Sequence, residues 1–255
     1  MTPLEIITIC YLLLIGAGMA GFLHMAAIRR ARGDRCLSGR SRCPVCGSLL
    51  RFYELIPVVS WIFLAGRCRH CKAKIAVRFL IAELIGALSL PLIYLRFGVH
   101  YMTPIILIVT GLLFAIAIID ITTREIPNGL IIALVPLAAA AAWAQPEIDV
   151  ISRAIGFAVV SLPMFIMALI VHDSFGAGDI KLIAVCGFMM GWQGAVLAFV
   201  LAAVTGAVFA TVLIIRKKLK RKELMPFGQF LCLGVYISLL CGGDIISRYL
   251  ELFGL

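Results

Sequence analysis

The 255-residue sequence predicts an all-α polytopic membrane protein, with about eight transmembrane helices and a cytoplasmic loop like a zinc ribbon. Composition is the first observation: 63% of the residues are hydrophobic and only 14% are charged, with a mean hydropathy of +1.10. Soluble domains are about half apolar and about a quarter charged. The other two observations are a series of long apolar runs and four cysteines in paired spacing within a basic segment.

The apolar runs predict the helices in chain order. They lie at 4–28, 79–95, 102–119, 127–144, 150–171, 180–190, 193–215 and 226–246. Glu5 lies at the start of the first run and no Lys or Arg precedes it, so we expect a retained first helix and not a signal peptide. The run 180–190 would rise roughly 16 Å as a helix, about half of a ~30 Å hydrocarbon core.

Basic residues fix the expected orientation. Of the 23 Lys and Arg, twelve lie in 29–78 and six in 216–222, and such clusters mark cytoplasmic segments. With both termini outside, alternating crossings place both clusters inside only if the chain reverses at 191–194. Neither cluster interleaves basic with aromatic residues, which argues against nucleic acid as the reason for the +10 net charge. Anionic membrane lipids suit these clusters better.

Two cysteine pairs predict a metal site. Cys43-Pro-Val-Cys46 and Cys68-Arg-His-Cys71 are separated by 21 residues, a spacing that suits four thiolates around one structural Zn²⁺ per chain. Disulfides are the alternative, but the cytoplasm is reducing. A thioredoxin-like redox role would need a βαβ context, which this segment lacks. His70 is expected beside the ligands rather than among them.

Two aspartates end up at the same predicted membrane face. Asp120 closes one apolar run and Asp179 precedes the half-length run, and a carboxylate at the membrane edge is costly to keep. Two close carboxylates share one proton, so that one acts as acid while the other activates water for peptide hydrolysis. The alternative interpretation is structural: Asp120 pairs with Arg124, and Asp179 caps the helix beginning at Ile180.

Residues around Asp179 favour the catalytic interpretation. Gly176 and Gly178 allow a substrate backbone to approach, and Lys181 would bias a neighbouring carboxylate towards its charged form. Glu83 lies inside another apolar run, where we expect it either to pair with Arg78 or to serve a site.

Several motifs, taken together, resemble one known family over most of the chain. They are Cys43-Pro-Val-Cys46-Gly47, Tyr53-Glu54-Leu55-Ile56-Pro57, Gly66-Arg67-Cys68-Arg69-His70-Cys71, Asp120-Ile-Thr-Thr-Arg-Glu-Ile-Pro127-Asn128, Gly176-Ala-Gly-Asp-Ile-Lys-Leu182 and Pro226-Phe-Gly228. In this order and spacing the chain resembles the type IV prepilin peptidases (prepilin leader peptidase/N-methyltransferases), which are polytopic GxGD aspartyl proteases.

The resemblance implies a function for each motif. Asp120 and Asp179 correspond to the catalytic aspartates, and Glu54 matches a position associated with methyl transfer. The four paired cysteines correspond to the zinc cluster. The implied enzyme lies in the bacterial inner membrane, cleaves type IV prepilins or pseudopilins after a Gly on the cytoplasmic side, and methylates the new N-terminus from S-adenosylmethionine.

The resemblance also implies three regions: a first helix (1–28), a zinc and methyltransferase loop (29–78) and a protease domain (79–255). Two positions depart from the family pattern: His24 replaces an Asn, and Ser174 replaces a Gly. His24 motivates the alternative of a peptidase without methyl transfer. A non-catalytic zinc-ribbon membrane protein is the remaining alternative, and the sequence leaves a homo-oligomer open.

Overall fold

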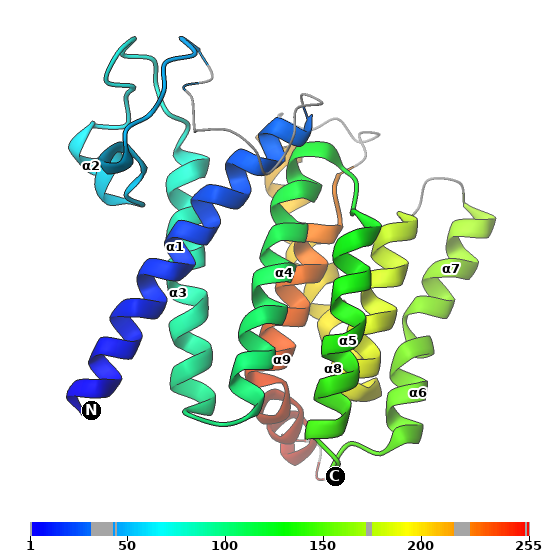
Figure 1. Ribbon diagram of the computed structural model, residues 1–255. Helices are drawn as coiled ribbons and strands as arrows, with labels where there is room; N and C mark the ends of the chain where they lie inside the picture. The colour runs from blue at the N-terminus through cyan, green and yellow to red at the C-terminus, as the bar shows by residue number, and fades with distance from the viewer. Residues whose placement is uncertain are drawn as a thin grey trace. The chain divides into compact units, whose positions relative to one another are not determined.

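The computed structural model describes residues 2–31, 43, 45–171, 175–216, 225–252 and 254. Apart from isolated bridge residues, which include the antiparallel pair Arg67 and Lys74, regular structure in these residues is helical, which confirms the predicted all-α class. The elements are α1 (Pro3–Ala31), the 3₁₀ helix η1 (Phe52–Leu55), α2 (Val59–Phe63), α3 (Val77–Phe97), α4 (Met102–Thr123), α5 (Asn128–Ala144), α6 (Val150–Val159), α7 (Ser161–Ile170), α8 (Ala177–Ile215) and α9 (Gly228–Leu252) (Figure 1).

The chain divides into two compact units, Met1–Val99 and His100–Leu255. The first contains α1, α2 and α3 with the cysteine pairs, and the second contains α4 to α9. The three functional regions expected from the sequence stay a prediction about roles, and the two units describe how the chain packs.

Six described stretches of helix are long and apolar enough to cross a membrane, one of them formed by α6 and α7 together. Their most apolar windows have mean hydropathies of 1.7 to 2.7, yet only 17–44% of each window is buried within the protein. Outward-facing apolar side chains are what lipid requires, so the chain is a multi-pass membrane protein. Helix α5, with 17 residues, is shorter, and the count of eight spans stays a prediction.

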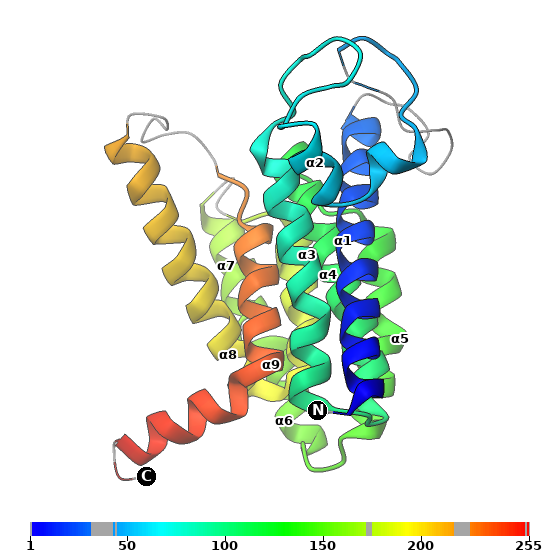
Figure 2. The same cartoon turned by 90° about the vertical axis from the view of Figure 1, so that its left-hand side faces the viewer.

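Helix α8 contains a reversal of the chain. Its 39 residues would extend about 58 Å if straight, nearly twice the ~30 Å hydrocarbon core. Gly191 interrupts it with φ 78° and ψ 175°. A Cβ on Gly187 would lie 3.2 Å from Ala195 Cβ, whereas eight residues of straight helix rise about 12 Å. The chain therefore turns back near the predicted position, and both ends of α8 lie at the same end of the second unit (Figures 1 and 2).

A buried arginine secures the other end of the second unit. Arg153 on α6 is 2% exposed, and its guanidinium donates to the carbonyls of Gln145 at 2.7 Å and Met189 at 2.9 Å. These carbonyls lie at the C-terminal ends of α5 and of the first half of α8, where helices leave acceptors unpaired. Arg153 thus joins three helices where lipid offers no hydrogen bonds.

In the first unit α1 and α3 pack closely through small residues. A Cβ on Gly16 would lie 2.1 Å from the Gly86 carbonyl oxygen, and one on Gly86 would lie 2.7 Å from Ala20 Cβ. Backbones can approach this closely only where side chains are absent or small. The contact holds the two helices together, and the segment that contains the cysteine pairs connects them in the sequence.

Candidate active site

Three helix ends meet in the second unit and position the two predicted catalytic acids. Asp120 lies in the last turn of α4, Asp179 in the first turn of α8, and α9 begins beside them at Gly228. Figure 2 shows these ends on the same side of the unit. Asp120 is 5% exposed and Asp179 is 8% exposed, so both carboxylates are nearly withdrawn from water.

The two carboxylates converge on Gly228. A Cβ at Gly228 would lie 2.9 Å from Asp120 Oδ2 and 3.0 Å from Asp179 Oδ1, so these oxygens lie within about 6 Å of each other. The Gln229 backbone N–H donates to Asp120 Oδ2 at 3.1 Å. Asp179 Oδ1 is buried without a hydrogen-bond partner among the described residues. The pair is therefore asymmetric: one acid has a fixed donor and the other has an open acceptor.

The structure does not show the two alternatives to a catalytic role, an Asp120–Arg124 pair and an Asp179 helix cap. Arg124 leaves the helix in a left-handed conformation, with φ 57°, and donates its backbone N–H to the Asp120 carbonyl. Gly176, not Asp179, is the N-cap of α8, and that cap has no side-chain hydrogen bond. Lys181 donates to Asn128 Oδ1 at 3.1 Å, so its ammonium group lies on a neighbouring amide rather than on either carboxylate.

The two glycines before Asp179 allow close packing at the site. A Cβ on Gly178 would lie 2.7 Å from Ile126 Cβ, so the turn after α4 rests against the start of α8. A Cβ on Gly176 would lie 3.2 Å from Asp179 Oδ2, which leaves little room beside that carboxylate. Phe175 and Phe227 pack edge to face at 5.7 Å and join the segments that precede α8 and α9.

The four predicted zinc ligands come together in the first unit. The sulfurs of Cys43, Cys46, Cys68 and Cys71 all lie within 4.8 Å of one another, and those of Cys43 and Cys71 are 3.9 Å apart. Tetrahedral Zn²⁺ with bonds of about 2.3 Å separates its sulfurs by about 3.8 Å. The cluster therefore has the dimensions of a metal centre, although the metal itself is not observed.

Both cysteine pairs adopt the same backbone turn. In the first, Gly47 N–H donates to Cys43 C=O at 2.9 Å and Cys43 N–H donates to Ser48 C=O at 2.9 Å. In the second, Lys72 N–H donates to Cys68 C=O at 3.0 Å, and Cys68 N–H donates to Ala73 C=O at 2.8 Å. Gly47 and Lys72 both have positive φ, of 69° and 59°. A turn repeated at both pairs supports the binding of one metal ion by all four cysteines.

Hydrogen bonds favour the metal-binding form of two of these thiols. The Ser48 hydroxyl, 2.9 Å from Cys46 Sγ, lowers the pKa of Cys46 from 9.0 to about 6. The Cys71 backbone N–H lowers the pKa of Cys68. A metal binds the thiolate, so donors that stabilise the anion also favour coordination.

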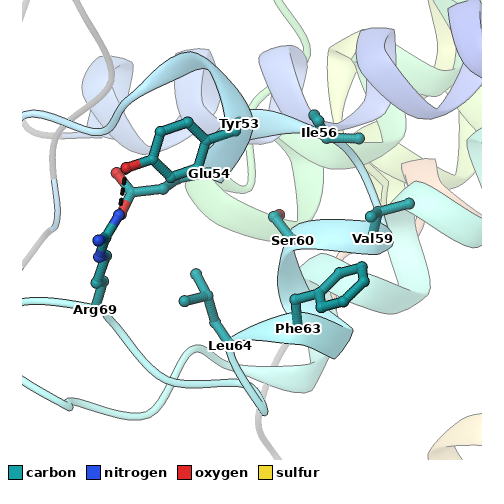
Figure 3. Close-up of a pocket in the computed structure, with 8 residues that line it drawn as sticks. All are labelled: Tyr53, Glu54, Ile56, Val59, Ser60, Phe63, Leu64 and Arg69. Atoms are coloured by element: carbon teal, nitrogen blue, oxygen red, sulfur yellow. Dashed lines mark hydrogen bonds between the residues drawn. The ribbon is translucent and has the colours of Figure 1, made fainter.

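A cavity of about 350 Å³ lies in the first unit, and the residues that line it belong to the same segment as the cysteine pairs (Figure 3). It is lined by Tyr53, Glu54, Ile56, Val59, Ser60, Phe63, Leu64 and Arg69. Glu54 is 8% exposed; its Oε2 accepts the Arg51 N–H at 2.7 Å, while its Oε1 is buried without a hydrogen-bond partner in the described part of the chain. Arg69 donates to the Tyr53 hydroxyl and lies over the Tyr53 ring, 5.6 Å from its centroid.

The structure shows contacts of two side chains in the first unit whose partners the sequence did not settle. Glu83 accepts the backbone N–H of Val58 at 2.7 Å, and the side chain of its expected partner, Arg78, lies outside the described residues. His24 is 7% exposed and packs its ring against Phe79, with centroids 4.1 Å apart.

Sequence reasoning missed the roles of Gly228 and Gln229. They act through the backbone, by absence of a side chain and by an N–H, and such contributions leave little trace in a single sequence. The signal available was the turn-forming Pro226-Phe227-Gly228 at the start of an apolar run. Likewise, nothing in the spacing of Tyr53 and Arg69 indicated a common cavity.

Comparison with known families covers both units. The family described as Bacterial Peptidase A24 N-terminal domain matches residues 14–97, and the Type IV leader peptidase family matches residues 107–211. A prepilin leader peptidase/N-methyltransferase of Bacillus subtilis (strain 168) is 30% identical over 94% of this chain and 97% of its own length. The chain belongs to the type IV leader peptidase family.

Further members of this family show similar coverage. Proteins with the same name from Stutzerimonas stutzeri and Pseudomonas aeruginosa are 31% and 30% identical, over 90% and 84% of this chain and 81% and 76% of their own. No solved structure gives a significant match. The resemblance inferred from the motifs is thus confirmed at the level of the family.

Proposed function

We propose that this protein is a membrane-embedded aspartic endopeptidase that removes the leader of type IV prepilins or pseudopilins and then methylates the new N-terminal amine. The observation that carries the peptidase half is the convergence of Asp120 and Asp179 on Gly228. The relatives named prepilin leader peptidase/N-methyltransferase, which cover most of this chain, support both activities.

The asymmetry of the pair supports a different catalytic role for each acid. Asp120, fixed by the Gln229 N–H, is the base that takes a proton from the attacking water. Asp179, whose Oδ1 has an open acceptor position, is the acid that gives its proton to the scissile carbonyl oxygen. As the tetrahedral diol collapses, the ionised Asp179 takes a proton back from one diol hydroxyl and the C=O bond re-forms. The C–N bond breaks and the proton held by Asp120 passes to the leaving amine, so both acids return to their starting states.

The scissile bond is the one after a Gly at the cytoplasmic membrane edge. The enclosed carboxylates require the substrate to enter from the lipid side or from the membrane edge, as an inserted apolar helix with a cytoplasmic leader would. Gly176 keeps side-chain atoms away from Asp179 Oδ2, and Gly178 lets the turn at Ile126 pack against the start of α8. Both termini then lie outside the bacterial inner membrane, as the basic clusters predict.

The cysteine cluster would hold one structural Zn²⁺. Sulfur separations, the repeated turns and the stabilised thiolates all fit a closed four-thiolate site, which leaves no position for a reacting water. The metal would therefore stabilise the segment that contains Glu54, Tyr53 and Arg69, and take no part in the chemistry of either reaction.

The cavity is our candidate for the methyl donor. When bound, S-adenosylmethionine supplies a methyl group activated by a positive sulfonium. The buried Glu54 Oε1 has no hydrogen-bond partner among the described residues, so it is a suitable counter-charge. Phe63 and Leu64 provide an apolar wall, and Tyr53, fixed by Arg69, faces them (Figure 3). Water exclusion by these side chains would protect the transfer.

Purified protein in liposomes with a synthetic prepilin tests this function. Mass spectrometry of the product separates its parts: we expect leader removal, followed by a single methyl group on the new N-terminus when S-adenosylmethionine is added. Cleavage without methylation would support the peptidase-only alternative that His24 suggests. An uncleaved prepilin would contradict the proposal as a whole.

A further inference from the structure

Glu83 is an acid within a membrane-spanning helix that neither reaction above uses. It lies on α3, inside the apolar stretch Phe79–Phe97, where an ionisable side chain is costly and usually functional. Its Oε2 accepts the Val58 backbone N–H at 2.7 Å, across 25 residues of sequence. Among the described residues, the donor to this carboxylate is a backbone N–H of a connecting segment, which suggests that the segment needs to be held.

The backbone at Val58 explains that need. Val58 has φ 61° and ψ −51°, and the Val59 N–H donates to the Pro57 carbonyl at 2.5 Å. These values define a γ-turn with a positive central φ, which is the rare and strained form. A β-branched residue makes that conformation still less favourable. Strained backbone persists only where its surroundings enforce it, and it concentrates at functional sites.

The turn lies between two parts of the cavity wall. Before it, η1 presents Tyr53 and Glu54, and Ile56 follows; after it, α2 presents Val59 and Ser60. A change of φ at Val58 would therefore swing α2 relative to Glu54 and alter the shape of the cavity. The hydrogen bond that Val58 N–H donates to Glu83 lies at the hinge between the two walls.

Helix α1 limits where the Glu83 side chain can go. A Cβ on Gly21 would lie 3.0 Å from Glu83 Oε1, so the carboxylate rests directly on the surface of α1. Because α1 and α3 are packed tightly through Gly16 and Gly86, this support is rigid. The acid is thus fixed by two membrane helices and transmits their position to the cavity.

We propose that Glu83 is a positioning residue for methyl transfer, which holds the Val58 turn and thereby sets the distance between the Glu54 wall and the α2 wall of the cavity. This inference rests on the proposed methyltransferase function. It assigns a role to the membrane helices of the first unit: they form a frame that shapes the cavity, in addition to anchoring it.

Four variants test the proposal in the full-length protein. Glu83→Ala removes the acceptor, whereas Glu83→Gln keeps an oxygen that can accept the Val58 N–H. Val58→Gly in the Glu83→Ala background allows the positive φ without support. Leu84→Ala, a truncation at an exposed neighbour on α3, is the matched control. Methylation is measured on a pre-cleaved pilin peptide at varied S-adenosylmethionine, leader cleavage is measured separately, and hydrogen exchange is followed for the segment 55–61.

We expect Glu83→Ala to reduce kcat/KM for methylation about tenfold, mainly through KM for S-adenosylmethionine, with leader cleavage unchanged. Glu83→Gln should keep most of the methylation, and the added Val58→Gly should restore part of it. Exchange in 55–61 should rise in Glu83→Ala and stay low in Glu83→Gln and Leu84→Ala.

Two results would overturn the proposal: unchanged exchange in 55–61 in Glu83→Ala, or an equal loss of cleavage and methylation in that variant. If Glu83→Gln is as impaired as Glu83→Ala, the charge matters rather than the hydrogen bond, and the proposal is also wrong. A wild-type protein that does not methylate would refute the methyltransferase function, and the exchange measurement would still decide whether Glu83 holds the turn.

Discussion

The two units solve the problem of placing reactive groups by opposite means. In the second unit, Asp120 and Asp179 belong to long apolar helices, and their meeting point depends on how helix ends pack. In the first unit, the cysteines and Glu54 lie in a short irregular segment with little apolar core of its own. That segment contains the four-cysteine cluster, and its Val58 N–H donates a hydrogen bond to Glu83 of a membrane helix.

Because the two sites are built differently, we expect leader cleavage and methylation to be separable by mutation. A site made from packed helices is sensitive to volume changes of a single methyl group, whereas a site made from a cross-linked segment is sensitive to loss of the cross-link. The following substitutions exploit that contrast, each affecting one unit and leaving the other as an internal control.

The largest effect is expected at the aspartates. Asp120→Asn or Asp179→Asn removes a general base or acid, so leader cleavage should fall by about 10²–10⁴-fold. Methylation of a pre-cleaved pilin peptide should continue at the wild-type rate, because that cavity is in the first unit. Cleavage is followed by mass spectrometry of a synthetic prepilin; a fully active variant at either position would refute the assignment of the pair.

Gly228→Ala should have the next largest effect. The new Cβ would lie 2.9–3.0 Å from oxygens of both aspartates, so at least one carboxylate must move. A displacement near 1 Å costs about 10²-fold in rate at a catalytic site. Gly243→Ala on the same helix, where a Cβ meets no atom within 4 Å, is the matched control. Equal cleavage rates in the two variants would show that Gly228 does not support the pair.

Cys68→Ser tests the first unit. We expect zinc content, measured by elemental analysis, to fall from one per chain, and methylation to fall on the order of 10–100-fold as the segment loses its cross-link. Cleavage should change little. Cys10→Ser, at an exposed position on α1, is the control for loss of a thiol. Methylation that survives without zinc would mean that the cluster does not shape the cavity.

Glu54→Gln should give the smallest effect. It keeps the shape of the side chain and removes the counter-charge proposed for the methyl donor, so S-adenosylmethionine should bind about tenfold more weakly. Equilibrium binding of the donor gives this value directly, with no contribution from chemistry. If affinity is unchanged while methylation falls, Glu54 acts on the amine rather than on the donor.

The sequence predicted some features well because they depend on local composition. The apolar runs and the turn near Gly191 follow from chain hydropathy and charge, and the cysteine pairs follow from ligand spacing. The pairing of Asp120 with Arg124 was a reasonable local alternative. It does not form because Arg124 turns out of the helix, a conformation that sequence spacing does not reveal.

What the sequence determined by itself is the membrane character, the helical class and the identity of the reactive side chains, since these depend on residue type and on periodicity. Only the tertiary structure showed that two aspartates 59 residues apart lie close together, and that Gly228, which has no side chain, leaves room for their carboxylates. It alone revealed that Glu83 accepts the backbone N–H of Val58, where the chain makes a strained turn. Contacts between distant segments depend on packing volumes and backbone geometry, which no local pattern encodes.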